Sequence, residues 1–373
     1  MKERVSKILL IFGFILIVEL IGLSWSFSEN RDLRLNQEML QGGNFISNAL
    51  NELGTEKGNG NLLCITNAGY GTLKGQTTEA FLDLFSNMTG CSMGTRSFLA
   101  IQTSYVDPLW CALYRKDHRR LIFIKWCETT FKVQKVDLAY DKIYQPENWK
   151  TNASGIIGGN NLLFSLVSIS SSWSENASWT HLKAAGFHNH YCPGVEVGYL
   201  IAQYLKNNLP LREGERYFFM GAPPYCPMDV LQVLFDATPG KQMVFSKTID
   251  SQKIEKYSGD LWLDNPPLPP LIAIALRVNA KSNICQGVVL GMDYKSLFND
   301  IGENYLDFNP LGGKSNPIYH IARVRVASKM VSMNMAEKLR YIKEVKSFSG
   351  PAALTQKIAR EGTDPYAIIW DLK

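Results

Sequence analysis

Two histidines and a cysteine lie within five positions of the segment FHNHYCPGVEVGY, residues 187–199. The whole chain has five histidines among 373 residues, so this pair stands out. In an extended segment, residues i, i+2 and i+4 project to one side, and His188, His190 and Cys192 would then converge. Imidazole and thiolate ligands favour zinc or another divalent transition metal over calcium or magnesium. The spacing therefore predicts a metal site, although the same residues could also form a structural turn.

A helix is expected directly after this segment, because Pro193-Gly194 ends the extended stretch and apolar residues then recur at helical spacing. The positive end of that helix would favour the thiolate form of Cys192. Cys226, in PPYCPMD, also precedes a predicted helix and could be the fourth ligand or a neighbouring thiol. Asp229 lies at the start of that second helix and could accept a ring N–H from one of the histidines.

A turn is expected after the second helix, at Thr238, Gly240 and Lys241. Its lysine would bring positive charge to an anionic group of a ligand.

The elements around these residues mix helices and strands without a regular βαβ alternation, which predicts the α+β class. Strands are expected at 61–70, 161–169, 241–249, 271–278 and 284–292, and a β-hairpin at 109–126. Helices are expected at 77–85, 195–209, 227–237, 336–346 and 351–362. Residues 145–180 are rich in Ser, Asn, Gly and Trp and are interpreted as a linker that contains the strand at 161–169.

Composition and charge exclude some classes of protein. Hydrophobic residues make up 46% and charged residues 20% of the chain, which is typical of globular proteins. The net charge of +5 is spread along the sequence, and the basic run RKDHRR (115–120) is more typical of a solvated turn. We therefore expect no nucleic-acid partner.

The N-terminus indicates export. A short basic stretch, MKERVSK, precedes an apolar run, which predicts a signal peptide or an N-terminal membrane anchor over residues 1–26. Three N-glycosylation sequons agree with an extracytoplasmic location, either secreted or anchored. The seven cysteines are an odd number without a Cys-x-x-Cys pair, which is typical neither of a disulfide framework nor of a zinc ribbon.

Two separated motifs resemble the FmdE family, named for formylmethanofuran dehydrogenase. The first is His-x-His-x-Cys-Pro-Gly with a later Gly-Tyr, and the second is Cys-x-x-Asp-x-x-Gln leading to Thr-x-Gly-Lys. The matching positions are His188, His190, Cys192, Pro193, Gly194, Gly198, Tyr199, Cys226, Asp229, Gln232, Thr238, Gly240 and Lys241. The resemblance covers about residues 181–295 and implies an α+β fold, dimerisation and a metal-associated His/Cys site, with Asp229, Gln232, Thr238 and Lys241 as supporting or ligand-binding residues.

The resemblance also suggests a duplication. The stretch 78–94 has the same helix-then-Thr/Gly layout as 228–241, and TGCSMG (89–94) looks like a degenerate copy of a family motif. We therefore expect a degenerate FmdE-like domain at 30–160 and a second FmdE-like domain with the complete motif at 161–373. The two would form an internal pseudo-dimer with mixed sheets and flanking helices.

The chain departs from the family pattern in three ways. Asn189 replaces the usual glycine between the histidines, no cysteine-rich ribbon is present, and the export signal separates the protein from cytoplasmic formylmethanofuran chemistry. The activity in the family name is therefore not expected here, although an anaerobic archaeal source is.

Three functions remain open from the sequence. The leading hypothesis is an exported protein that captures a transition metal ion, or a metal-bearing small molecule such as a tetrapyrrole, through His188, His190 and Cys192. The alternative is an extracytoplasmic thiol- or metal-dependent enzyme, with Cys192 as nucleophile or redox thiol and a histidine as base. The third is a structural surface protein in which the motif is a relic.

Overall fold

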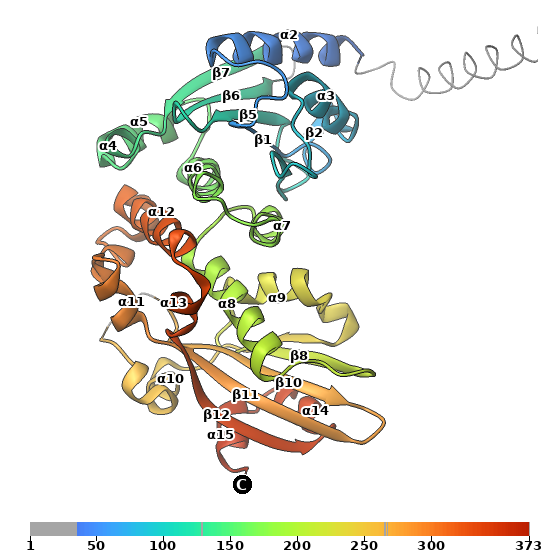
Figure 1. Cartoon of the computed structure of the whole chain (residues 1–373), viewed down its shortest axis with the longest axis vertical. Helices are drawn as coiled ribbons and strands as arrows, with labels where there is room; N and C mark the ends of the chain where they lie inside the picture. Colours follow the sequence, from blue (N-terminus) through green and yellow to red (C-terminus); the bar gives the residue numbers. More distant parts are fainter. Residues whose placement is uncertain (1–35, 128–129, 265, 267, 373) are drawn as a thin grey trace, which may run out of the picture.

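The computed structural model describes residues 36–127, 130–264, 266 and 268–372. These residues form two five-stranded mixed sheets with a layer of helices between them and further helices on the outer faces (Figure 1). The mixed sheets and flanking helices confirm the predicted α+β class. The expected signal or anchor at 1–26 lies outside the described residues. Within the described part of the chain, no helix is long and apolar enough to cross a membrane.

The N-terminal sheet has the strand order β4-β1-β5-β6-β7. Its strands are β1 (Leu62–Thr66), β4 (Phe98–Ala100), β5 (Trp110–Arg115), β6 (Arg120–Cys127) and β7 (Thr130–Asp137). The hairpin of β5 and β6 is the predicted one. The outer face carries α2 (Asn36–Glu52) and α3 (Ala80–Thr89), and the inner face packs against α6 (Asn160–Ser174) and α7 (Trp179–His188). The short elements of this half are β2 (Thr72–Leu73), β3 (Gln76–Thr77), α4 (Tyr140–Ile143) and α5 (Pro146–Ser154).

The C-terminal sheet has the order β12-β11-β10-β8-β9. Its strands are β8 (Glu215–Gly221), β9 (Val244–Ser246), β10 (Leu271–Asn279), β11 (Ile284–Met292) and β12 (Ile342–Pro351). One face packs against α8 (Pro193–Asn208), α9 (Pro227–Phe235), α11 (Tyr294–Asp300) and α12 (Pro317–Ser332). The other face packs against α10 (Ser251–Ser258), α14 (Leu354–Ala359) and α15 (Pro365–Trp370). The short elements are α13 (Met335–Leu339) and the 3-10 turns η1 (Pro239–Lys241), η2 (Gly259–Leu261), η3 (Tyr305–Phe308) and η4 (Gly313–Ser315).

The two sheets share one topology. In each, a parallel pair at one edge is followed by three antiparallel strands in chain order: β4 and β1, then β5, β6 and β7; β9 and β8, then β10, β11 and β12. A helix crosses between the parallel strands in both sheets, α3 in the first and α9 in the second, as parallel pairing requires. The segments paired in the sequence, 78–94 and 228–241, therefore occupy equivalent topological positions.

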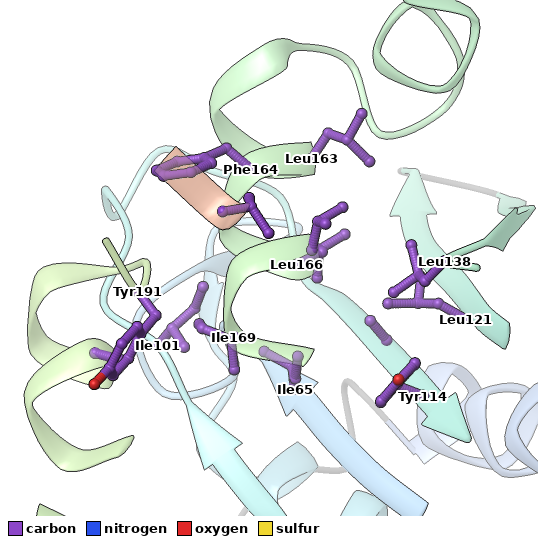
Figure 2. Packing of buried hydrophobic residues seen from close by; sticks show 14 of the residues in the cluster. Ile65, Ile101, Tyr114, Leu121, Leu138, Leu163, Phe164, Leu166, Ile169 and Tyr191 are labelled. Carbon is purple, nitrogen blue, oxygen red and sulfur yellow. The ribbon is translucent and has the colours of Figure 1, made fainter. Parts of the chain in front are cut away.

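The middle helical layer joins the two halves through one buried cluster. Side chains of the inner face of the N-terminal sheet, such as Ile65, pack against α6, and Tyr191 lies at the edge of the same cluster (Figure 2). Ile321 of α12 and Val230 of α9 belong to it too, so both halves share a core. The metal-site segment lies in this layer.

The strand predicted at 161–169 is wrong, because these residues form helix α6. Every residue from Leu163 to Ser172 in α6 is buried, since the helix lies between the N-terminal sheet and α12. A helix buried on all sides shows no amphipathic period, and its short apolar run cannot be distinguished from a buried strand.

The helix predicted at 336–346 is also wrong over most of its length. Helix α13 ends at Leu339, and the chain then enters β12, which pairs antiparallel with β11. Backbone hydrogen bonds to the neighbouring strand β11 outweighed the helical preference of the local sequence. No helix was expected over residues 36–52, which form α2.

Candidate metal centre

Three helix ends bring the predicted ligands together. His188 is the last residue of α7, Cys192 is the N-cap of α8, and Cys226 is the N-cap of α9. The prediction that His188, His190 and Cys192 lie on one continuous extended segment is wrong. Asn189 ends α7 in the left-handed region with φ 60°, and only then does the chain turn to Cys192. Glycine adopts this conformation readily and asparagine tolerates it, which explains how Asn189 replaces the family glycine.

The ligand atoms of His188, His190, Cys192 and Cys226 all lie within 4.8 Å of one another. Cys192 Sγ is 3.9 Å from His188 Nε2. Tetrahedral zinc, with bonds of about 2.0–2.3 Å, places a nitrogen and a sulfur ligand about 3.5 Å apart, so only a small contraction is needed. Two imidazoles and two thiols are a known zinc donor set, and the residues present therefore fit a bound zinc ion.

Two glycines allow the second cysteine to approach. A Cβ at Gly194 would lie 2.7 Å from Cys226 Cβ and 3.0 Å from its Sγ, and a Cβ at Gly198 would lie 2.6 Å from Val230 Cβ. Gly194 and Gly198 are four residues apart and share one face of α8. The N-terminus of α9 packs on this face, so any larger side chain there would push Cys226 away from Cys192.

Hydrogen bonds orient both imidazoles. His188 Nδ1 is 2.6 Å from Asp229 Oδ2, and His190 Nδ1 is 2.9 Å from Asn189 Oδ1. Because each oxygen is an acceptor, each Nδ1 carries the hydrogen and each Nε2 lone pair is left for a metal. Gln232 donates to the other oxygen of Asp229 at 3.4 Å, which holds the carboxylate in place.

The thiols and His188 have shifted pKa values. Burial lowers the pKa of His188, but hydrogen bonds with Asp229 and Cys226 outweigh burial and raise this pKa to about 9. The neighbouring Cys226 lowers the pKa of Cys192, while Cys192 and burial raise the pKa of Cys226 to about 12. Cys192 is therefore the thiol of the pair that loses its proton first.

The backbone and one distant arginine favour this thiolate. Both cysteines stand at helix N-termini, where free amides and the helix dipole stabilise negative charge. The amides of Val195 and Gly194 contribute to the lowered pKa of Cys192, and so does the positive charge of Arg323 on α12. Arg323 is nine-tenths buried and lies over the ring of Tyr319.

Sequence reasoning missed Arg323, and it also missed Phe164. The Phe164 ring lies 4.9 Å from that of His190, centroid to centroid. Both residues lie more than twenty positions from the motifs, and no local spacing could have indicated them.

The predicted turn residues Thr238 and Lys241 lie beyond the far end of α9. Nine helical residues separate them from Cys226, which corresponds to about 14 Å. Lys241 forms an ion pair with Asp236 of its own turn. The structure therefore brings Asp229 and Gln232 to the cluster and leaves Thr238 and Lys241 apart from it.

Residues 187–259 match the family model described as FmdE, Molybdenum formylmethanofuran dehydrogenase operon. The match begins one residue before His188 and includes Cys226 and Lys241, so the chain carries an FmdE-family domain, as the two motifs predicted. The degenerate N-terminal copy lies outside this match and stays a prediction. The comparison with curated proteins found no match.

Proposed function

We propose that this protein binds a divalent transition metal, with zinc as the best fit, through His188, His190, Cys192 and Cys226. The convergence of two imidazole nitrogens and two sulfurs within 4.8 Å carries this proposal. Cys226 completes a four-ligand set, which is the arrangement of zinc sites without an open position.

A metal ion suits this geometry better than a tetrapyrrole does. A tetrapyrrole already supplies four ligands to its metal and leaves one or two positions for protein side chains. Four protein donors at one point would instead surround a bare ion. The thiol-enzyme alternative is weakened by burial, because Cys192 is 4% exposed and a nucleophile must reach its substrate.

The bound ion would connect the two halves of the molecule. His188 ends α7, which packs on the N-terminal sheet, whereas Cys226 begins α9, which packs on the C-terminal sheet. A metal held by both would stabilise the middle layer. Metal binding would thus be coupled to the folding of that layer.

Elemental analysis of purified protein reconstituted with zinc tests the proposal. We expect one zinc per chain in the wild type and a loss of stoichiometric zinc in His190→Ala, Cys192→Ser and Cys226→Ser. In the cobalt form, a sulfur-to-cobalt charge-transfer band should weaken stepwise as each cysteine is replaced. Cys127→Ser on β6 and His118→Ala in an exposed turn are matched controls that should keep full occupancy. Full occupancy in all variants would leave the motif as a structural turn.

Two further proposals concern the whole chain. We propose an extracytoplasmic location, which the basic and apolar N-terminal segment supports, and cell fractionation with N-terminal sequencing tests it. We also propose that the N-terminal unit is a degenerate copy of the FmdE-like unit, packed as an internal pseudo-dimer. The shared strand order of the two sheets supports this duplication.

A further inference from the structure

A cavity of about 690 Å³ adjoins the metal cluster, within the size range of small-molecule sites. Its wall includes Trp110 and Lys125 from the N-terminal sheet, the start of α6, and Lys314 from η4. Asn189 also lines it, and the same side chain hydrogen bonds to His190. One residue thus belongs both to the cavity wall and to the orientation of a metal ligand.

The positive charges in this cavity form no ion pair with the residues that the structure describes. Lys125 is half-buried and Lys314 is exposed, and neither forms an ion pair with any described carboxylate. Asp107 is the one carboxylate among the described residues of the wall, and its Oδ2 already accepts a hydrogen bond from the amide of Ser104 at 3.1 Å. The cavity therefore has two lysines against one acid.

Unpaired donors face the same space. Helix α6 begins after Gly158 and Gly159, which have φ values of 80° and 152°, and no side chain caps it. The Lys125 ammonium lies 3.8 Å from where a Cβ on Gly158 would be, so the lysine reaches this loop. The amides that start a helix need an outside acceptor. Trp110, which is 2% exposed, also lines the cavity.

We propose that this cavity binds a small molecule that carries an oxyanion, a carboxylate or a phosphate, at the start of α6 between Lys125 and Lys314. The rest of the molecule would extend along Trp110 toward Asn189 and the metal cluster. This inference rests on the proposed metal function only for the end of the ligand that would lie near the metal cluster. The two lysines and the free amides at the start of α6 carry the anion site independently.

Isothermal titration calorimetry of the full protein, zinc-loaded and zinc-free, with inorganic phosphate and with acetate tests this site. We expect saturable binding of at least one probe, and the tighter probe assigns the oxyanion class. Lys125→Gln and Lys314→Gln should each weaken binding about tenfold or more, because each removes a charge-assisted contact. Lys183→Gln, on the exposed surface of α7, is the matched control and should bind as the wild type does.

Two results would overturn the inference: no saturable binding of either probe to the wild type, or unchanged affinity in both lysine variants. Zinc content, measured on the same samples, separates the two proposals. Lysine-dependent anion binding without zinc would retain the cavity and refute the metal site. One zinc per chain without anion binding would retain the metal site and refute the cavity as an anion site.

Discussion

The two halves of the molecule have the same strand order and the same crossover helix, yet among the described residues only the crossover helix of the second half, α9, begins at a metal-ligand cluster. Where α9 begins at Cys226, α3 begins after Thr78 and Glu79. The Thr78 hydroxyl donates to the carbonyl of Gly71 and accepts from the amide of Gly69, so it closes a turn. The shared topology thus does not depend on a metal. Buried apolar faces form the sheets, and the ligands are an addition to one of them.

The halves differ in buried charge as well. Glu196 on α8 is fully buried and pairs with Lys338 at 2.7 Å and with His181 at 3.2 Å. Tyr191, next to the ligand Cys192, donates a hydrogen bond to the same carboxylate. No carboxylate is buried among the described residues of the N-terminal unit. The C-terminal unit therefore combines its metal motif with a buried ionic network that locks α8 and α13.

Removing the metal should have the largest effect, and the response in amide hydrogen exchange should differ between the two halves. Structural zinc sites contribute about 10–16 kcal/mol of binding free energy, which is coupled to folding. Chelation should therefore speed amide hydrogen exchange in the segments that supply the ligands, α7, α8 and the start of α9. Exchange in β1 and β5, which lie in the other half, should change little. Equal acceleration in both halves would contradict this difference.

Glu196→Gln should have the next largest effect. Burial raises the pKa of Glu196, but His181 and Lys338 outweigh burial and lower it from 4.5 to about 2. The stabilisation is thus complete above about pH 4.5 and is lost as the pH falls toward 2. At pH 7 the variant leaves Lys338 buried without its partner, at a cost of about 3–5 kcal/mol in the free energy of unfolding.

Urea denaturation at several pH values measures this effect. The wild type should lose the contribution of Glu196 between pH 4.5 and 2, and the variant should lack that change. The double variant Glu196→Gln/Lys338→Met should recover part of the loss, because no charge then remains buried. An identical cost at pH 7 and at pH 2 would show that the network does not stabilise the fold through its charge.

Asp229→Asn should weaken zinc binding about 10–100-fold without preventing it, because Asp229 orients His188 and is not itself a ligand. In the wild type, zinc must displace a proton from His188, whose pKa is about 9. Deprotonation of His188 should therefore contribute about a tenfold rise in apparent affinity per pH unit up to pH 9, in addition to the rise that comes from deprotonating the Cys226 thiol, whose pKa is about 12. The variant should show a flatter rise, because the carboxylate that raises this pKa is gone. Competition with a chromophoric chelator measures both, and an unchanged slope would contradict the role of Asp229.

Gly194→Ala and Gly43→Ala compare a glycine in each half and should have the smallest effects, with opposite signs. Alanine at Gly194 would press on Cys226 and should destabilise by about 1–3 kcal/mol. A Cβ at Gly43, inside α2, would have its nearest contacts at 3.9 Å and should stabilise by about 0.5–1 kcal/mol. Thermal unfolding measures both, and stabilisation by Gly194→Ala would refute the close approach of α9.

Local patterns in the sequence predicted much of the outcome correctly. The hairpin of β5 and β6, strands β10 and β11, and helices α8 and α9 all follow from apolar periodicity and turn residues. The four candidate ligands come together as the motifs suggested. Helix α6 and strand β12 could not be predicted in this way, because their conformations depend on what surrounds them.

Residue type and spacing by themselves determined the donor set, the two Cys-Pro helix starts, and the partnership of Asp229 with a histidine. These are properties of side-chain chemistry and of short segments, in which neighbours in sequence are neighbours in space. Tertiary structure alone decided that Phe164 packs beside His190, that the charge of Arg323 acts on Cys192, and that Lys125 and Lys314 share a cavity with Asn189. These residues are brought together from distant parts of the chain by the packing of two sheets on one helical layer, and no local period records that packing.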